Sequence, residues 1–233
     1  MSPVAFIIGA GPHIGAAVGT LLKQNGYRIA LGSRNPSKIS NETEAEEGGF
    51  YHVKVDASSS ESIQAAFRTV NKELGPPNVV IYNAASFLPL PTPEDPLSLP
   101  LESFESSTAV GLGVFAAAQQ AIPGFRSGVH KHSPKAFIVT GNLLPFVSAL
   151  PAYTSLDVQK VVAARLVETF AAAYKDDDIR FYFASFVSPS GEISLEDFPK
   201  SAETHAQVYW ELINSEIQGN WDHRFTLDGK KLP

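Results

Sequence analysis

The feature that most constrains this chain is an apolar strand that runs directly into a glycine-rich turn. Residues 4–8 are apolar, and Gly9, Gly11 and Gly15 follow just before a helix with one apolar face. A strand, a glycine turn and a helix in this order present backbone N–H groups and a helix N-terminus to a pyrophosphate. Glycine is needed because a side chain would block the approach of the backbone to the phosphates. The stretch predicts a dinucleotide site; a purely structural turn is the alternative.

Composition narrows the classes of protein to which the chain can belong. Its 233 residues fit one dinucleotide-binding domain over 1–233, and the net charge of −6 argues against a nucleic-acid partner. No apolar run is long enough to span a membrane, and the first strand begins at residue 4, so we expect neither a membrane segment nor a signal peptide. The absence of cysteine excludes disulfides and thiol catalysis and is compatible with a cytoplasmic protein.

Strand and helix patterns alternate along the rest of the chain. Strands are predicted at 27–31, 50–55, 79–82, 136–140, 180–187 and around 224–227, with helices near 60–74, 102–125, 151–175 and 200–217. A loop with five prolines at 89–100 fits neither a helix nor a central strand. Repeated βα units predict an α/β fold, a Rossmann-type doubly wound parallel sheet with helices on both faces.

The histidines and a run of aspartates do not indicate a metal site. Six histidines are scattered along the chain, and none has the helical spacing of metal ligands. We interpret His130 and His132, in a polar stretch, as surface residues. The three aspartates at 176–178 are interpreted as a solvated helix end, so no metal is expected.

Several landmarks, in order from residue 4 to about 190, resemble the short-chain dehydrogenase/reductase family. The turn at 8–15 resembles the family's TGxxxGxG motif, with His13 in place of the middle glycine. Asp56 is similar to the family's aspartate that contacts adenine, and residues 83–85, Asn-Ala-Ala, resemble its Asn-Ala-Gly. Residues 189–191 read Pro-Ser-Gly where the family has Pro-Gly. The resemblance implies a small-molecule substrate and a nicotinamide cofactor.

The same resemblance implies which residues hold the cofactor. They are Gly9, Gly11, His13, Ile14, Gly15, Ser33, Arg34, Asp56, Ala57, Asn83, Ala84 and Lys160. Ser33 and Arg34 end the second predicted strand, where members that prefer NAD usually carry an acidic residue. A guanidinium pairs with a 2′-phosphate, and a serine hydroxyl can donate to it. NADP(H) is therefore the expected cofactor, and an arginine that touches nothing is the alternative.

The catalytic region departs from the family's Asn, Ser, Tyr and Lys. One register sets Tyr153 in the place of the tyrosine and Asp157 in the place of the lysine. A second register, which we prefer because the following helix then fits without a gap, retains the lysine as Lys160. It replaces the tyrosine, serine and asparagine with Leu156, Leu143 and Val110. The stretch also resembles a group of fungal short-chain-dehydrogenase-like proteins with Thr-Gly-Asn and a leucine before the lysine, a resemblance that implies no particular activity.

The second register has a chemical consequence. Leucine cannot transfer a proton, and loss of a general acid forfeits roughly 10²–10⁴-fold in rate. Tyr153 is a candidate proton donor, because it is seven residues from Lys160 on one predicted helix and so shares its face. A packing role for Tyr153 is the alternative. Asn142 can orient a carbonyl oxygen or serve as a turn residue.

Two functions stay open, and whether the chain is an enzyme stays open with them. The first is an NADP(H)-dependent reductase of an activated C=N, C=C or C=O bond in an apolar small molecule, with Lys160 and Tyr153 as catalytic candidates. The second is a non-redox protein on the same scaffold, either an isomerase or cyclase or a cofactor-sensing regulator. Apolar residues on more than one face of the helix at 151–175 predict a homodimer or homotetramer.

Overall fold

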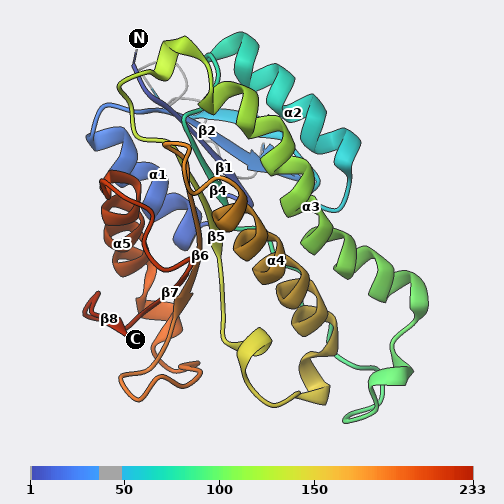
Figure 1. The fold of residues 1–233 in the computed structure, drawn as a ribbon. Helices are drawn as coiled ribbons and strands as arrows, with labels where there is room; N and C mark the ends of the chain where they lie inside the picture. Colours follow the sequence, from blue (N-terminus) through green and yellow to red (C-terminus); the bar gives the residue numbers. More distant parts are fainter. Residues whose placement is uncertain (1, 37–48, 233) are drawn as a thin grey trace.

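One eight-stranded sheet forms the centre of the fold (Figure 1). The computed structural model describes residues 2–36 and 49–232, within which the strand order is β3-β2-β1-β4-β5-β6-β7-β8. The strands are β1 (Val4–Ile8), β2 (Arg28–Ser33), β3 (Tyr51–Lys54), β4 (Val79–Tyr82), β5 (Ala136–Thr140), β6 (Arg180–Phe186), β7 (Asp222–Phe225) and β8 (Lys231–Leu232). Neighbouring strands are parallel, except that β8 is antiparallel to β7.

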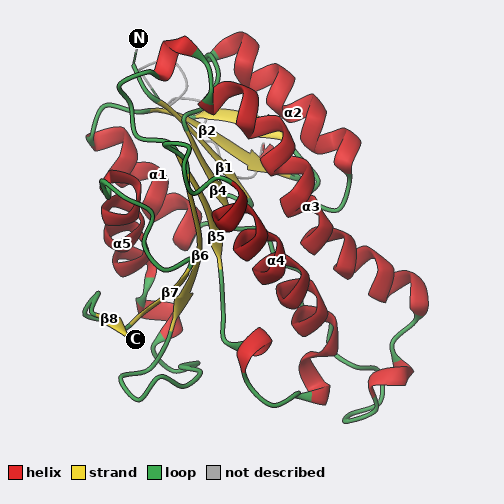
Figure 2. Ribbon diagram, in the orientation of Figure 1, coloured by secondary structure: helices red, strands yellow, loops and turns green. Residues whose placement is uncertain are grey.

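Helices cover both faces of the sheet (Figures 1 and 2). One face carries α1 (Ile14–Gln24) and α5 (Ala202–Asn214), and the other carries α2 (Ser60–Glu73), α3 (Leu101–Phe125) and α4 (Thr154–Ala173). Short 3₁₀ turns lie in the connections: η2 (Pro96–Ser98), η3 (Gly128–His130), η4 (Leu144–Phe146), η5 (Pro151–Tyr153) and η6 (Phe198–Lys200). The predicted Rossmann-type α/β fold is confirmed.

The central strands are apolar throughout because both of their faces are covered. Every residue of β1, β4 and β5 is buried. Successive side chains point to opposite faces, so Phe6 packs among the α2–α4 residues while Ile7 packs among those of α1 and α5. Two hydrophobic layers therefore hold the carboxyl ends of these strands in fixed positions.

The predicted strand and helix limits lie close to the observed ones, with a difference at the end of the chain. The predicted strands at 79–82 and 136–140 coincide with β4 and β5. The predicted parallel sheet extends from β3 to β7, and β8, a strand that was not predicted, returns antiparallel along β7 after a turn in which Gly229 has φ +78°. A two-residue strand carries no periodic pattern, so the sequence could not indicate it.

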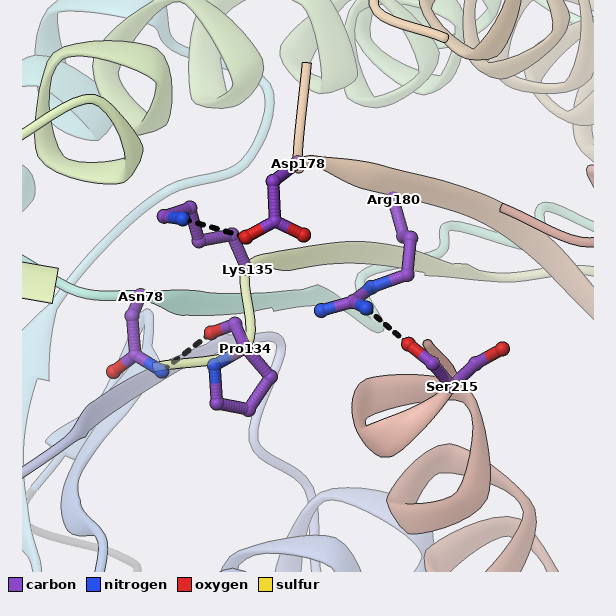
Figure 3. A network of polar contacts seen from close by, with 6 residues as sticks. All are labelled: Asn78, Pro134, Lys135, Asp178, Arg180 and Ser215. Carbon is purple, nitrogen blue, oxygen red and sulfur yellow. Dashed lines mark hydrogen bonds and ion pairs between the residues drawn. The ribbon is translucent and has the colours of Figure 1, made fainter. Parts of the chain in front are cut away.

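Polar side chains at the amino edge of the sheet join the beginnings of neighbouring strands (Figure 3). The side chain of Asn78 donates to the carbonyl of Pro134 at 2.8 Å, and Lys135 pairs with Asp178 at 2.8 Å. These contacts link the segments before β4, β5 and β6. Since this edge lies opposite the carboxyl ends of the strands, its charged residues serve the fold.

The interpretation of His130 as a surface residue was wrong. His130 is 1% exposed, and its Nε2 is hydrogen-bonded to a carbonyl of the segment before β4. The aspartates at 176–178 are exposed shortly after the end of α4, as interpreted, and Asp177 pairs with Arg126 at 2.7 Å and Asp178 with Lys135. Across residues 2–36 and 49–232 no group of His, Asp and Glu could hold a metal ion, and no helix is long and apolar enough to cross a membrane.

Candidate active site

The carboxyl ends of β1 and β4 border a crevice where the order of the strands reverses. From β1 the chain continues to β2 on one side, whereas β4 lies on its other side. Ligands of open α/β sheets bind at such a switch point. A cavity of about 460 Å³ opens here, and it is lined by eight of the predicted cofactor residues, Gly9, Gly11, Ser33, Arg34, Asp56, Ala57, Asn83 and Ala84.

The cavity also includes residues that the sequence did not single out. Asn35, Ser58 and Ser86 line it next to predicted residues. Ser106 reaches it from α3, as does Val110, which the preferred register sets in the place of the family's asparagine. Asn35, Ser58 and Ser86 could have been predicted, because each is close in sequence to a predicted cofactor residue. No local sequence signal marks Ser106, because α3 reaches the cavity only through the packing of the fold.

The glycines of the turn serve different purposes. Gly9 has φ +85°, and a Cβ there would lie 2.5 Å from the backbone nitrogen of Ala84. A Cβ on Gly15 would lie 2.7 Å from the Cα of Ala10. Gly11, by contrast, has no atom of the described residues within 4 Å of its Cβ position. Gly9 and Gly15 therefore allow close packing of the turn, while Gly11 leaves its backbone open toward the cavity.

His13 and Ile14 follow this turn, and their side chains point elsewhere. Ile14 is buried among the residues of α1 and α5. The Nε2 of His13 lies 3.1 Å from the carbonyl oxygen of Pro199, and its ring centroid is 5.3 Å from that of Phe198. His13 thus connects the glycine turn to η6, in the segment between β6 and α5.

The end of β2 offers two groups suited to an anion. Among residues 2–36 and 49–232 the buried hydroxyl of Ser33 has no hydrogen-bond partner, and both Ser33 and Arg34 line the cavity. Asp56, which follows the neighbouring strand β3, accepts hydrogen bonds from the hydroxyl and amide of Ser58, and these bonds lower the pKa of the carboxyl. An unpaired hydroxyl beside a guanidinium fits the 2′-phosphate of NADP(H).

Lys160 lies in the interior of α4 and is buried. Its Nζ donates to the backbone carbonyl of Thr140 at 2.7 Å, where β5 ends. Burial lowers the pKa of the amine to about 8. Lys160, Ala84 and Val110 surround one small hollow, and the last two also line the main cavity. The lysine therefore stands directly behind the wall of the cavity.

The other candidate catalytic positions are apolar or turn residues. Leu143 is buried just after β5, and Leu156 is half-buried in the first turn of α4. Tyr153 ends η5 and precedes α4, so the expectation that it shares a helix face with Lys160 was wrong. Its ring packs 5.4 Å from that of Phe87. The helix begins at residue 154 because a proline-led 3₁₀ turn occupies 151–153.

Comparison with known proteins agrees with this geometry. A family model described as enoyl-(acyl carrier protein) reductase matches residues 9–191. A short-chain dehydrogenase/reductase of Cryptosporiopsis sp. (strain 8999) is 30% identical over 96% of this chain and 92% of its own length. The chain belongs to the short-chain dehydrogenase/reductase family. This family consists of NAD(P)-dependent oxidoreductases.

Solved structures of short-chain dehydrogenases/reductases share the fold. A metagenomic short-chain oxidoreductase in complex with NADP has a TM-score of 0.78 and 18% identity, with 96% of each chain covered. An alcohol dehydrogenase of Thermococcus sibiricus complexed with 5-hydroxy-NADP has a TM-score of 0.71 and 22% identity, with 99% of each chain covered. At these identities the likeness shows only that the present protein shares their fold.

Proposed function

We propose that this member of the family is an NADP(H)-dependent reductase of an activated C=N, C=C or C=O bond in an apolar small molecule. The observation that carries the proposal is the pair Ser33 and Arg34 at the cavity, with the serine hydroxyl buried and unpaired within the part of the chain that the structure describes. Residues 33–36, the described residues at and just after the end of β2, include no carboxylate that would repel a 2′-phosphate. NADP bound to structural neighbours supports the same cofactor.

The residues of the site would divide the work as follows. Bound NADPH would supply a hydride. Gly11 would leave its backbone accessible to the pyrophosphate, and Asp56 would accept from the adenine. Lys160 would donate to the nicotinamide ribose, for which a charge and N–H donors suffice. With leucines at 143 and 156, the proton would come from water, from Tyr153 or from the substrate itself, and an iminium or enone needs less acid assistance than a ketone.

An apolar substrate is proposed because the loops at this edge of the sheet expose apolar side chains. Phe87 follows β4, Val147 and Leu150 follow β5, and Ile193 and Phe198 follow β6, and all five are exposed. An apolar ligand that covers such residues gains free energy from the area removed from water.

The cofactor assignment is tested by titration of NADPH and NADH with the intrinsic fluorescence of the protein as the signal. We expect tighter binding of NADPH in the parent and a selective loss of NADPH affinity in Arg34→Asp, while NADH affinity is little changed. Arg68→Asp in α2, away from the cavity, is the matched control. Equal affinity for the two cofactors in the parent would refute the assignment.

A second function has its own observation. Leu143 and Leu156 offer no proton donor at the positions of the family's serine and tyrosine, which favours a protein that binds the dinucleotide without redox chemistry. Incubation with NADPH and a panel of imines, enones and ketones separates the two. A reductase consumes NADPH in a 1:1 ratio to product, whereas an isomerase, cyclase or regulator consumes none.

We also propose that the protein assembles as a symmetric homodimer through α3 and α4. Leu112 and Phe115 on α3 are 57% and 49% exposed, and Val161 on α4 is 44% exposed. Large apolar side chains on adjacent helices favour burial against a second copy.

A further inference from the structure

Thr140, the last residue of β5, is held from three directions by buried hydrogen bonds. Its hydroxyl accepts from the hydroxyl of Tyr209 in α5 at 2.8 Å and lies 2.8 Å from the Oδ1 of Asn83. Its backbone carbonyl accepts from Lys160 at 2.7 Å. The Nδ2 of Asn83 in turn donates to the carbonyl of Gly9 at 2.8 Å. One chain of contacts thus runs from α5 to the glycine turn.

The direction of this chain follows from the chemistry of its members. The Oδ1 of Asn83 can only accept, so Thr140 must give its single hydroxyl proton to Asn83. The Thr140 oxygen is then an acceptor for Tyr209. With its oxygen facing Thr140, the Asn83 amide presents its NH₂ group to Gly9. Together these constraints fix the direction of every hydrogen bond in the series.

This series of hydrogen bonds connects the two faces of the sheet next to the cavity. Tyr209 is fully buried in the layer of α1 and α5, whereas Lys160 belongs to α4 on the opposite face (Figure 1). Both end on Thr140 of β5, the strand that lies next to β4 at the cavity. Burial raises the pKa of the Tyr209 hydroxyl, so this group stays protonated and acts as a donor.

We propose that Tyr209 is a positioning residue of the dinucleotide site. Its hydroxyl orients Thr140 and Asn83, and through them it fixes the carbonyl of Gly9 and the shape of the glycine turn. The inference rests on the proposed function, since it assigns a role in binding NADPH, but the orientation of Asn83 can be measured without any cofactor.

The first experiment compares Tyr209→Phe with the parent and with Tyr182→Phe. Tyr182 is the matched control, because it is equally buried but its hydroxyl, among the residues that the structure describes, bonds only with the backbone at 217 and 219. We expect Tyr209→Phe to raise the Kd for NADPH about fivefold and Tyr182→Phe to leave it unchanged. Unfolding curves for both variants separate a general loss of stability from a loss confined to the site. An unchanged Kd in Tyr209→Phe would overturn the proposal.

The second experiment uses the protein without cofactor. The ¹⁵N-labelled side-chain amide of Asn83 should show slow hydrogen exchange in the parent and faster exchange in Tyr209→Phe and Thr140→Val. Thr140→Ser, which keeps the hydroxyl, should restore the slow exchange. If the variants lose protection from exchange but the parent does not bind NADPH, the positioning role of Tyr209 stands and the proposed cofactor is refuted. Equal protection in all variants would refute the role of Tyr209.

Discussion

Replacement of Lys160 by methionine should stabilise the protein without cofactor at neutral pH. The amine is buried with the Thr140 carbonyl as its hydrogen-bond partner, and its pKa is lowered to about 8 from 10.5. That difference corresponds to about 3 kcal/mol of destabilisation by the buried charge. The lost hydrogen bond to Thr140 offsets about 1 kcal/mol. Lys160→Met should therefore gain about 2 kcal/mol, or roughly 4–8 °C in Tm for a domain of this size.

The pH dependence identifies the cause. Below pH 8 the amine is charged in both states, so the full penalty acts on the folded parent. Between the folded pKa of about 8 and the unfolded value of 10.5 the unfolded chain binds more protons, and the stability of the parent rises with pH. The advantage of Lys160→Met should shrink from about 2 kcal/mol near neutral pH to nearly zero at about pH 10.

Urea unfolding of the parent and of Lys160→Met at both pH values provides the measurement. Lys72→Met is the control, because the side chain of Lys72 is 82% exposed and its pairing with Glu73 contributes little. A less stable Lys160→Met at neutral pH, or an advantage that does not change with pH, would refute the argument from buried charge.

Three further outcomes follow from the site and the surface. The double variant Leu156→Tyr with Leu143→Ser should measurably reduce simple ketones with NADPH, whereas the parent should do so negligibly. If the double variant is as inactive as the parent, the preferred register is contradicted. His13→Gly should release the segment around Pro199 from the glycine turn and speed NADPH dissociation roughly threefold in stopped-flow traces, an effect that should not occur if the contact is incidental. Leu112→Glu should shift the mass in light scattering toward 25 kDa, unless α3 lies outside the dimer interface.

The fold could be predicted from the sequence where local pattern and burial agree. β4 and β5 are short apolar runs covered on both faces, so their limits coincide with the pattern. The glycine turn was predicted because strand, turn and helix are contiguous. Most of the residues that line the cavity could be predicted from this turn and from the strand ends, since parallel strands bring their carboxyl ends to one edge of the sheet.

The remaining features depend on contacts that sequence patterns do not report. His13 and Pro199 are 186 residues apart, and Tyr209 and Thr140 are 69 apart. His130 lies in a polar stretch of the sequence, yet it is buried, and its ring is hydrogen-bonded to a backbone carbonyl of the segment that precedes β4. Tyr153 lies outside the helix because a 3₁₀ turn intervenes, which a seven-residue spacing cannot reveal.

The lowered pKa of Lys160 also predicts how cofactor affinity depends on pH. A bound ribose would offer hydroxyl oxygens to the amine, and hydrogen bonds to the charged form raise its pKa. Binding would then take up a proton above the free pKa of about 8, so NADPH affinity should be constant at lower pH and fall as the pH rises through 8. Titrations between about pH 6.5 and 9.5 test this in the parent and in Lys160→Met, in which the slope should vanish. A slope that persists in the variant would assign the proton to another group and remove Lys160 from the ribose.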